Sequence, residues 1–121
     1  MDYAYAVHEG AFGQAIVLET KASLVEHSHS ETQLAFWLGG ARATARTGSE
    51  VVSYSEDTAL GLNAFEAHEM TLLDSGACVF LVFRISSEWL EGRRRATGRS
   101  FVFLSPGVSI DHALRQACWR V

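Results

Sequence analysis

Two histidines two residues apart, His27 and His29, offer the clearest chemistry in the chain. Side chains of a β-strand alternate between its two faces, so both imidazoles of a strand-borne pair point the same way. The preceding run, residues 23–26, also alternates between polar and apolar residues, which favours a strand here. If that face lines the inside of a small barrel, two imidazoles enter the interior together. Imidazole nitrogens bind divalent transition metals and hydrogen-bond polar ligands.

Two further side chains are candidates for the same site. Gln33 stands at the start of the apolar run 34–38, which Gly39 and Gly40 end. His68 heads a strand-like run much further along the chain. Three histidines and an amide at these positions can converge on one metal ion or one polar ligand. Spacing alone equally allows histidines that are satisfied by hydrogen bonds, and both interpretations stay open.

Short strands must position these residues. Apolar runs separated by turn residues predict eight or nine strands, at 3–8, 12–19, 23–29, 33–38, 41–47, 51–54, 58–62, 67–73 and 78–85. Turn signals every eight to twelve residues are typical of an antiparallel sandwich or barrel. We therefore expect a mainly β fold with residues 1–85 forming a barrel.

The pattern changes after residue 85, and we expect a helical and extended tail over residues 86–121. Ser86 or Ser87 caps a first helix that ends near Gly92, and residues 101–104 form a short extended piece. A second helical stretch covers residues 110–119, with apolar residues on one stripe. Four positions of that stripe are predicted to contact a second copy in a homodimer: Ile110, Ala113, Leu114 and Ala117.

Composition excludes several classes of protein. The chain has 121 residues, which suits one domain, and it lacks an apolar run of 18 residues and a signal peptide, so we expect a cytoplasmic protein without a membrane span. Cys78 and Cys118 are predicted to be small buried hydrophobic residues rather than a disulfide.

Residues 1–83 carry three basic and eleven acidic side chains, whereas residues 84–121 carry seven arginines and three acids. An acidic body repels a phosphate backbone, so the arginine cluster at 93–95 is interpreted as a solvated helix end or loop rather than a DNA site.

The histidine segment resembles the first motif of the cupin family. His27, His29 and Gly40 match that motif, with Gln33 where the family has glutamate and Lys21 where it has the first glycine. Of the second cupin motif, His68 alone matches. The resemblance implies a double-stranded β-helix, that is, a jelly-roll barrel. It also implies a metal site at His27, His29, Gln33 and His68, where glutamine replaces the anionic ligand.

A resemblance that covers nearly the whole chain is to the N-terminal sensor domain of AraC-type transcription regulators. It rests on the histidine segment, the strand that ends at Gly39 and Gly40, residues 63–68, and residues 85–90 after the last long strand. In that family the barrel binds a small effector, helices form the dimer contact, and a C-terminal helix-turn-helix domain binds DNA. The resemblance implies that residues 86–121 lead toward such a domain, which is absent from this chain.

Three functions follow as alternatives. In the first, the chain is a non-enzymatic sensor that binds a small effector, with His27, His29, Gln33 and His68 as polar groups. Its apolar wall is drawn from Trp37, Tyr54, Met70, Phe83 and Phe36, although strand alternation turns Phe36 to the opposite face. In the second, it is a metal-dependent cupin dioxygenase or isomerase that uses iron, manganese, nickel or zinc. In the third, it is a structural cupin without a ligand.

Overall fold

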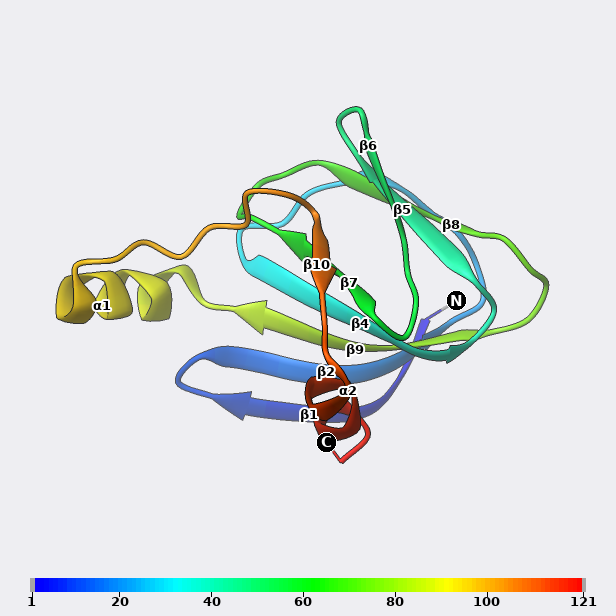
Figure 1. Ribbon diagram of the computed structural model, residues 1–121, viewed down its shortest axis with the longest axis horizontal. Helices are drawn as coiled ribbons and strands as arrows, with labels where there is room; N and C mark the ends of the chain where they lie inside the picture. The colour runs from blue at the N-terminus through cyan, green and yellow to red at the C-terminus, as the bar shows by residue number, and fades with distance from the viewer. Residues whose placement is uncertain (1, 121) are drawn as a thin grey trace.

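The computed structural model describes residues 2–120, without the side chains of Asp2, Tyr3 and Tyr5. Ten strands and two helices follow one another in the described part of the chain (Figure 1). They are β1 (Asp2–Gly10), β2 (Gly13–Thr20), β3 (Leu24–His27), β4 (Thr32–Gly40), β5 (Ala43–Thr47), β6 (Glu50–Ser53), β7 (Thr58–Leu62), β8 (His68–Leu72), β9 (Cys78–Ile85), α1 (Ser87–Thr97), β10 (Gly107–Ser109) and α2 (His112–Cys118). The expected mainly β class and the nine predicted strands are confirmed.

The strands form two antiparallel sheets. The larger sheet has the order β1-β2-β9-β4-β7-β10, and the smaller has the order β3-β8-β5-β6. Figure 1 shows the smaller sheet standing across from β4, β7 and β9, so that the inner faces of the two sheets enclose an interior. Apolar side chains that alternate along the strands fill this interior and drive the sheets together. Positions on the inner faces are therefore the ones that can form an enclosed site.

Two apolar clusters lie on opposite sides of the larger sheet. The first, between the sheets, includes Ala35, Leu60 and Phe80. The second, beneath the larger sheet, includes Phe36 and Leu81. Phe36 directly follows Ala35 on β4, and Leu81 directly follows Phe80 on β9. This division follows directly from the period of two in a strand. The expected opposite orientation of Phe36 is confirmed.

The tail contributes to the second cluster. Strand β10 pairs with β7, and Ile110 and Cys118 are buried below the sheet. Arg115 of α2 is 7% exposed, and its guanidinium donates hydrogen bonds to the backbone carbonyls of Trp37 and Leu38 on β4. Helix α2 is therefore attached to β4 by a buried arginine as well as by apolar packing.

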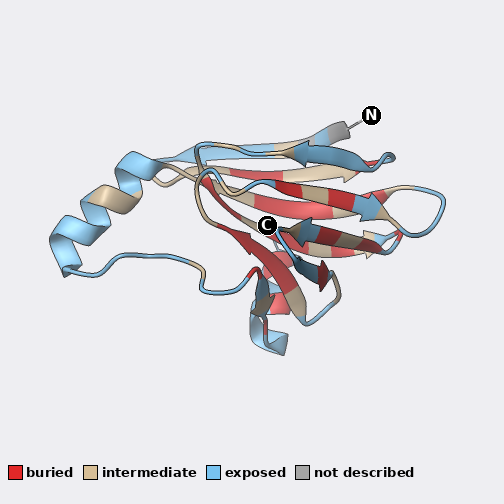
Figure 2. Cartoon of the chain, turned by 90° about the horizontal axis from the view of Figure 1, so that it is seen from above, coloured by how far each residue is buried: buried red, intermediate tan, exposed pale blue. Residues whose placement is uncertain are grey.

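Helix α1 is different, because none of its residues is buried and it projects from the sheets (Figure 2). The Ser86 hydroxyl accepts from the Trp89 N–H as the predicted cap. The predicted end near Gly92 is wrong. The helix continues to Thr97, where Gly98 adopts a left-handed conformation that ends it. Glu91 pairs with arginines one turn later, and such pairs support the helix past Gly92.

Two more predictions change in detail. Helix α2 starts at His112 with Asp111 as its cap, so Ile110 precedes the helix rather than starting it. Strand β3 ends at His27, so His29 lies in the loop before β4. Cys78 and Cys118 are buried and free, as expected. No helix in the described residues is long and apolar enough to cross a membrane.

Candidate ligand and metal site

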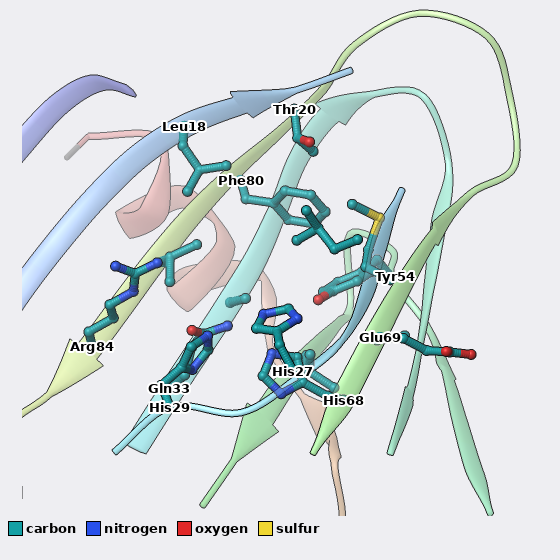
Figure 3. A pocket seen from close by; sticks show the side chains of 16 residues that line it. Leu18, Thr20, His27, His29, Gln33, Tyr54, His68, Glu69, Phe80 and Arg84 are labelled. Atoms are coloured by element: carbon teal, nitrogen blue, oxygen red, sulfur yellow. The ribbon is translucent and has the colours of Figure 1, made fainter. Parts of the chain in front are cut away.

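The neighbouring His27 and His29 meet His68, which is distant in sequence, between the sheets. His27 on β3 faces His68 on β8 directly in the antiparallel register, and their ring centroids are 4.2 Å apart. The loop after β3 brings the ring of His29 to 4.8 Å from His68 and 5.0 Å from His27. Figure 3 shows the three imidazoles together at one end of a cavity. The predicted convergence of the histidines is therefore present in the structure.

Backbone carbonyls orient two of the imidazoles. His27 Nδ1 lies 2.7 Å from the carbonyl oxygen of Val25, and His68 Nδ1 lies 3.0 Å from that of Glu66. A carbonyl oxygen can only accept, so both Nδ1 atoms carry the proton and donate it. In the neutral ring this leaves Nε2 with a free lone pair. Metal-binding histidines are usually held in this way, with one ring nitrogen donating to a carbonyl or carboxylate.

Two of the histidines, His29 and His68, are held in the neutral form that ligation requires. Burial lowers the pKa of His29 below its usual value, and the neighbouring charges of His68, His27 and Arg84 lower it further. Burial also lowers the pKa of His68, against the raising effect of its hydrogen bond to the Glu66 carbonyl. Desolvation disfavours the imidazolium form, so both rings are neutral at pH 7.

The donor set fits a divalent transition metal. One ligand atom from each histidine lies within 4.8 Å of the others. Two nitrogens bound to the same zinc or iron at about 2.1 Å are at most about 4 Å apart, so small side-chain rotations bring the rings into range. A bound zinc, nickel, iron or manganese ion would supply a Lewis acid at this point. Three protein ligands leave coordination positions for a small molecule.

Gln33 and Arg84 extend the polar side of the cavity. They are direct neighbours across β4 and β9, and both line the cavity with the histidines. Gln33 is 9% exposed, so its amide is almost completely enclosed. The sequence reasoning identified Gln33 but missed Arg84. Strand alternation provided the signal, because Arg84 continues the inward-facing series of Phe80 and Val82 on β9.

The rest of the cavity wall is mainly apolar. Tyr54 and Met70 line it, as predicted, and the Tyr54 ring packs 4.8 Å from that of Phe80. Burial raises the pKa of Tyr54, so its phenol stays neutral and is able to donate a hydrogen bond. The lining residues are Leu18, Thr20, Leu24, His27, His29, Gln33, Ala35, Ala45, Tyr54, Leu60, His68, Glu69, Met70, Phe80, Val82 and Arg84, around about 80 Å³.

Two predicted wall residues lie elsewhere. Trp37 is outside the cavity lining, where its indole packs against the first cluster and its Nε1 donates to the Ala41 carbonyl over 3.1 Å. Phe83 lies on the opposite face of the larger sheet, 6.0 Å from the ring of Phe36. Its place follows from its position between the inward-facing Val82 and Arg84.

The predicted dimer residues divide into two groups. Ile110 is buried in the second cluster and is 7% exposed, so it serves the core of this chain. Ala113, Leu114 and Ala117 are exposed on α2. Their role in a homodimer stays a prediction.

Comparison with known proteins shows the fold. No protein-family model and no curated protein matches this sequence. Among solved structures, AerE from Microcystis aeruginosa is similar over 81% of this chain with a TM-score of 0.65 and 11% identity, and this chain spans 43% of AerE. The cupin domain of Cnp3 from Schizosaccharomyces pombe is similar over 81% of this chain and 68% of its own length, with a TM-score of 0.59 and 15% identity.

A cupin-2 domain from Rhodospirillum rubrum is similar over 98% of this chain and 70% of its own length, with a TM-score of 0.55 and 14% identity. These likenesses show that the chain has the cupin fold. The predicted jelly-roll barrel with a short helical tail is therefore confirmed.

Proposed function

We propose that this chain is a ligand-binding cupin domain that captures a small molecule at its three histidines and acts as the sensor of an AraC-type transcription regulator. The observation that carries the proposal is the partly enclosed, mostly apolar cavity into which His27, His29, His68 and Gln33 converge. A few polar groups in an apolar wall are typical of sites that orient a small ligand. In this role the domain works in the cytoplasm and is not an enzyme.

The position of α2 supports a sensor role. Strand β4 carries Gln33 into the cavity, and further along it presents the Trp37 and Leu38 carbonyls to Arg115 of α2. A ligand that shifts β4 therefore acts on an element directly attached to α2. The exposed apolar positions of α2, Leu114 among them, then contact a second copy. Contact with DNA belongs to a separate helix-turn-helix domain.

A metal-dependent cupin enzyme, either a dioxygenase or an isomerase, is the second candidate. The observation that favours it is the fixed tautomer of His27 and His68, which leaves Nε2 of each ring free to bind a metal. A dioxygenase is among the proteins that share the fold. The absence of a carboxylate at position 33 favours the sensor, because an amide is a weaker ligand for a hard ion.

Metal analysis of protein purified without an affinity tag separates the two candidates. The His27→Ala variant removes one of the three histidines, and His8→Ala is the matched control because His8 is exposed on β1. A stoichiometric transition metal in the wild type, lost in His27→Ala and kept in His8→Ala, supports the enzyme. A metal-free barrel that still binds small molecules supports a sensor without a metal. Retention of the metal in His27→Ala would contradict the histidine site itself.

The dimer is tested separately by size-exclusion chromatography with light scattering. We expect a dimer for the wild type and a monomer for Leu114→Glu, because Leu114 is exposed on α2. Leu104→Glu is the control, since Leu104 is also exposed but lies outside α2. A wild type that stays monomeric at all concentrations would refute the dimer.

A further inference from the structure

Arg84 is a cation that the fold directs into the cavity. It lies near the end of β9, where it pairs in register with Gln14 of β2 and Gln33 of β4. Both neighbouring strands therefore flank it, and it shares the inner face of the sheet with Val82. Arg84 and the three histidines line the same cavity, and Figure 3 shows Arg84 at one side of it, away from His27 and His68. An arginine in this place needs an explanation, because an alternating core strand normally carries an apolar residue there.

The guanidinium of Arg84 has an unused donor. Its Nε is buried and, among the residues that the structure describes, it is the one buried side-chain nitrogen or oxygen without a hydrogen-bond partner. A buried donor without an acceptor is unfavourable, and such groups in native proteins are usually satisfied by a ligand or water. The orphaned donor therefore points to an acceptor that enters the cavity.

The nearby carboxylates are engaged elsewhere. Glu69 lines the cavity, but its carboxylate accepts from Arg46 Nε over 2.8 Å, and Figure 3 shows it turned away from the histidines. Glu31 lies outside the cavity lining, where its carboxylate accepts from the Ser30 hydroxyl over 3.1 Å. The charge of Arg84 contributes to lowering the pKa of Glu31, so this acid balances Arg84 in part from outside the cavity. In the described part of the chain, no ion pair joins Arg84 to a carboxylate.

The charge of the cavity is therefore positive. Position 33 carries an amide, and Glu69, the acidic residue of the lining, is paired with Arg46, so no carboxylate of the lining is left to balance the Arg84 charge. A divalent metal at the histidines would add two more positive charges. In a poorly solvated cavity such an excess strongly favours an anionic ligand.

Size and shape narrow the class of anion. A volume of about 80 Å³ suits a molecule of few non-hydrogen atoms, well below the 300 Å³ or more of pockets for drug-sized ligands. The planar guanidinium matches a planar carboxylate through two parallel hydrogen bonds. We propose that the cavity selects a small carboxylate, which Arg84 anchors at one end and presents to the histidines.

This inference rests on the proposed ligand-binding function and names the class of its ligand. The test is an NMR titration of protein without an affinity tag, with acetate as the probe and acetamide as its neutral match. Inorganic phosphate is titrated as a competing anion. Each titration is performed on metal-free protein and on protein loaded with Co²⁺. The variants are Arg84→Gln and Arg84→Lys, and Arg42→Gln is the control because Arg42 is exposed outside the cavity.

We expect acetate to bind at least 10-fold more tightly than acetamide. The loss of a charge-assisted hydrogen bond in Arg84→Gln should weaken acetate about 10- to 100-fold, with Co²⁺ affinity and acetamide binding unchanged. Arg84→Lys keeps the charge without the bidentate geometry, so its acetate affinity should lie between those of the wild type and Arg84→Gln. Arg42→Gln should behave as the wild type.

Three results would overturn the inference: no acetate binding, equal acetate binding in Arg84→Gln, or tighter binding of phosphate than of acetate. Each of them leaves the proposed ligand-binding function intact if the protein still binds acetamide and His27→Ala abolishes that binding. Conversely, acetate binding that depends on Arg84 in a protein that does not bind Co²⁺ supports the carboxylate site and contradicts the metal site. Circular dichroism checks that each variant is folded.

Discussion

Replacing Gln33 by glutamate should convert the histidine cluster into a tighter metal site. Gln33 is 9% exposed, lines the cavity with all three histidines and pairs in register with Arg84. Glutamate has nearly the same shape as glutamine, so the change adds a charge and little else. The introduced carboxylate finds a positive environment from Arg84 and from any bound metal ion.

The magnitude follows from the geometry of the sheet. Directly opposed residues on neighbouring strands have Cβ atoms about 5 Å apart. The attraction to Arg84 is the same with and without a metal, so it does not change metal affinity. At an effective dielectric constant of about 20, a divalent ion at a similar distance of about 5 Å would attract the carboxylate by about 7 kcal/mol. Desolvation of the carboxylate cancels much of this gain. We expect a net gain of about 2 kcal/mol, which corresponds to about 30-fold tighter metal binding.

Competition with a chromophoric chelator measures this affinity in protein without an affinity tag. Gln116→Glu is the matched control, because Gln116 is exposed on α2 and the substitution adds the same charge outside the cavity. The same Gln33→Glu protein should bind acetate more weakly, since its new carboxylate occupies Arg84. Metal affinity in Gln33→Glu that equals that of Gln116→Glu would show that position 33 does not face the metal.

Further predictions concern stability. In metal-free protein the lowered pKa values of His29 and His68 mean that, as pH falls below 6.5, the unfolded chain takes up protons first. The free energy of unfolding, measured by urea titration, should therefore decrease as the pH is lowered from 7 to 5. The double variant His29→Gln, His68→Gln should show a smaller decrease. Gly61→Ala should destabilise the fold by about 1–3 kcal/mol, because a Cβ there meets the Phe103 ring at 2.6 Å. Gly92→Ala should stabilise it by about 0.5–1 kcal/mol, since the helix has open space there; equal thermal shifts for the two glycine variants would contradict this packing.

Several features of this protein were determined by local sequence. Alternation and turn residues were enough to predict strands β1 to β9, because the period of a strand is a local property. The same alternation predicted that Phe36 faces away from the interior between the sheets. The pair His27 and His29 was evident from its spacing. The start of helix α1 was predicted from Ser86 or Ser87, and the structure has Ser86 as the cap. The predicted end at Gly92 was wrong, because the pairing of Glu91 with later arginines supports the helix beyond it.

Tertiary structure decided which distant residues share a site. His68 reaches His27 because β3 and β8 pair in one register, and a shift of one residue would turn one of them away. The role of Arg84 depends on β9 lying between β2 and β4 with its inner face on the cavity. Trp37 has the inward parity of Gln33, yet the strand carries it beyond the cavity. Alternation assigns a face to each side chain, whereas strand order and register decide what that face meets.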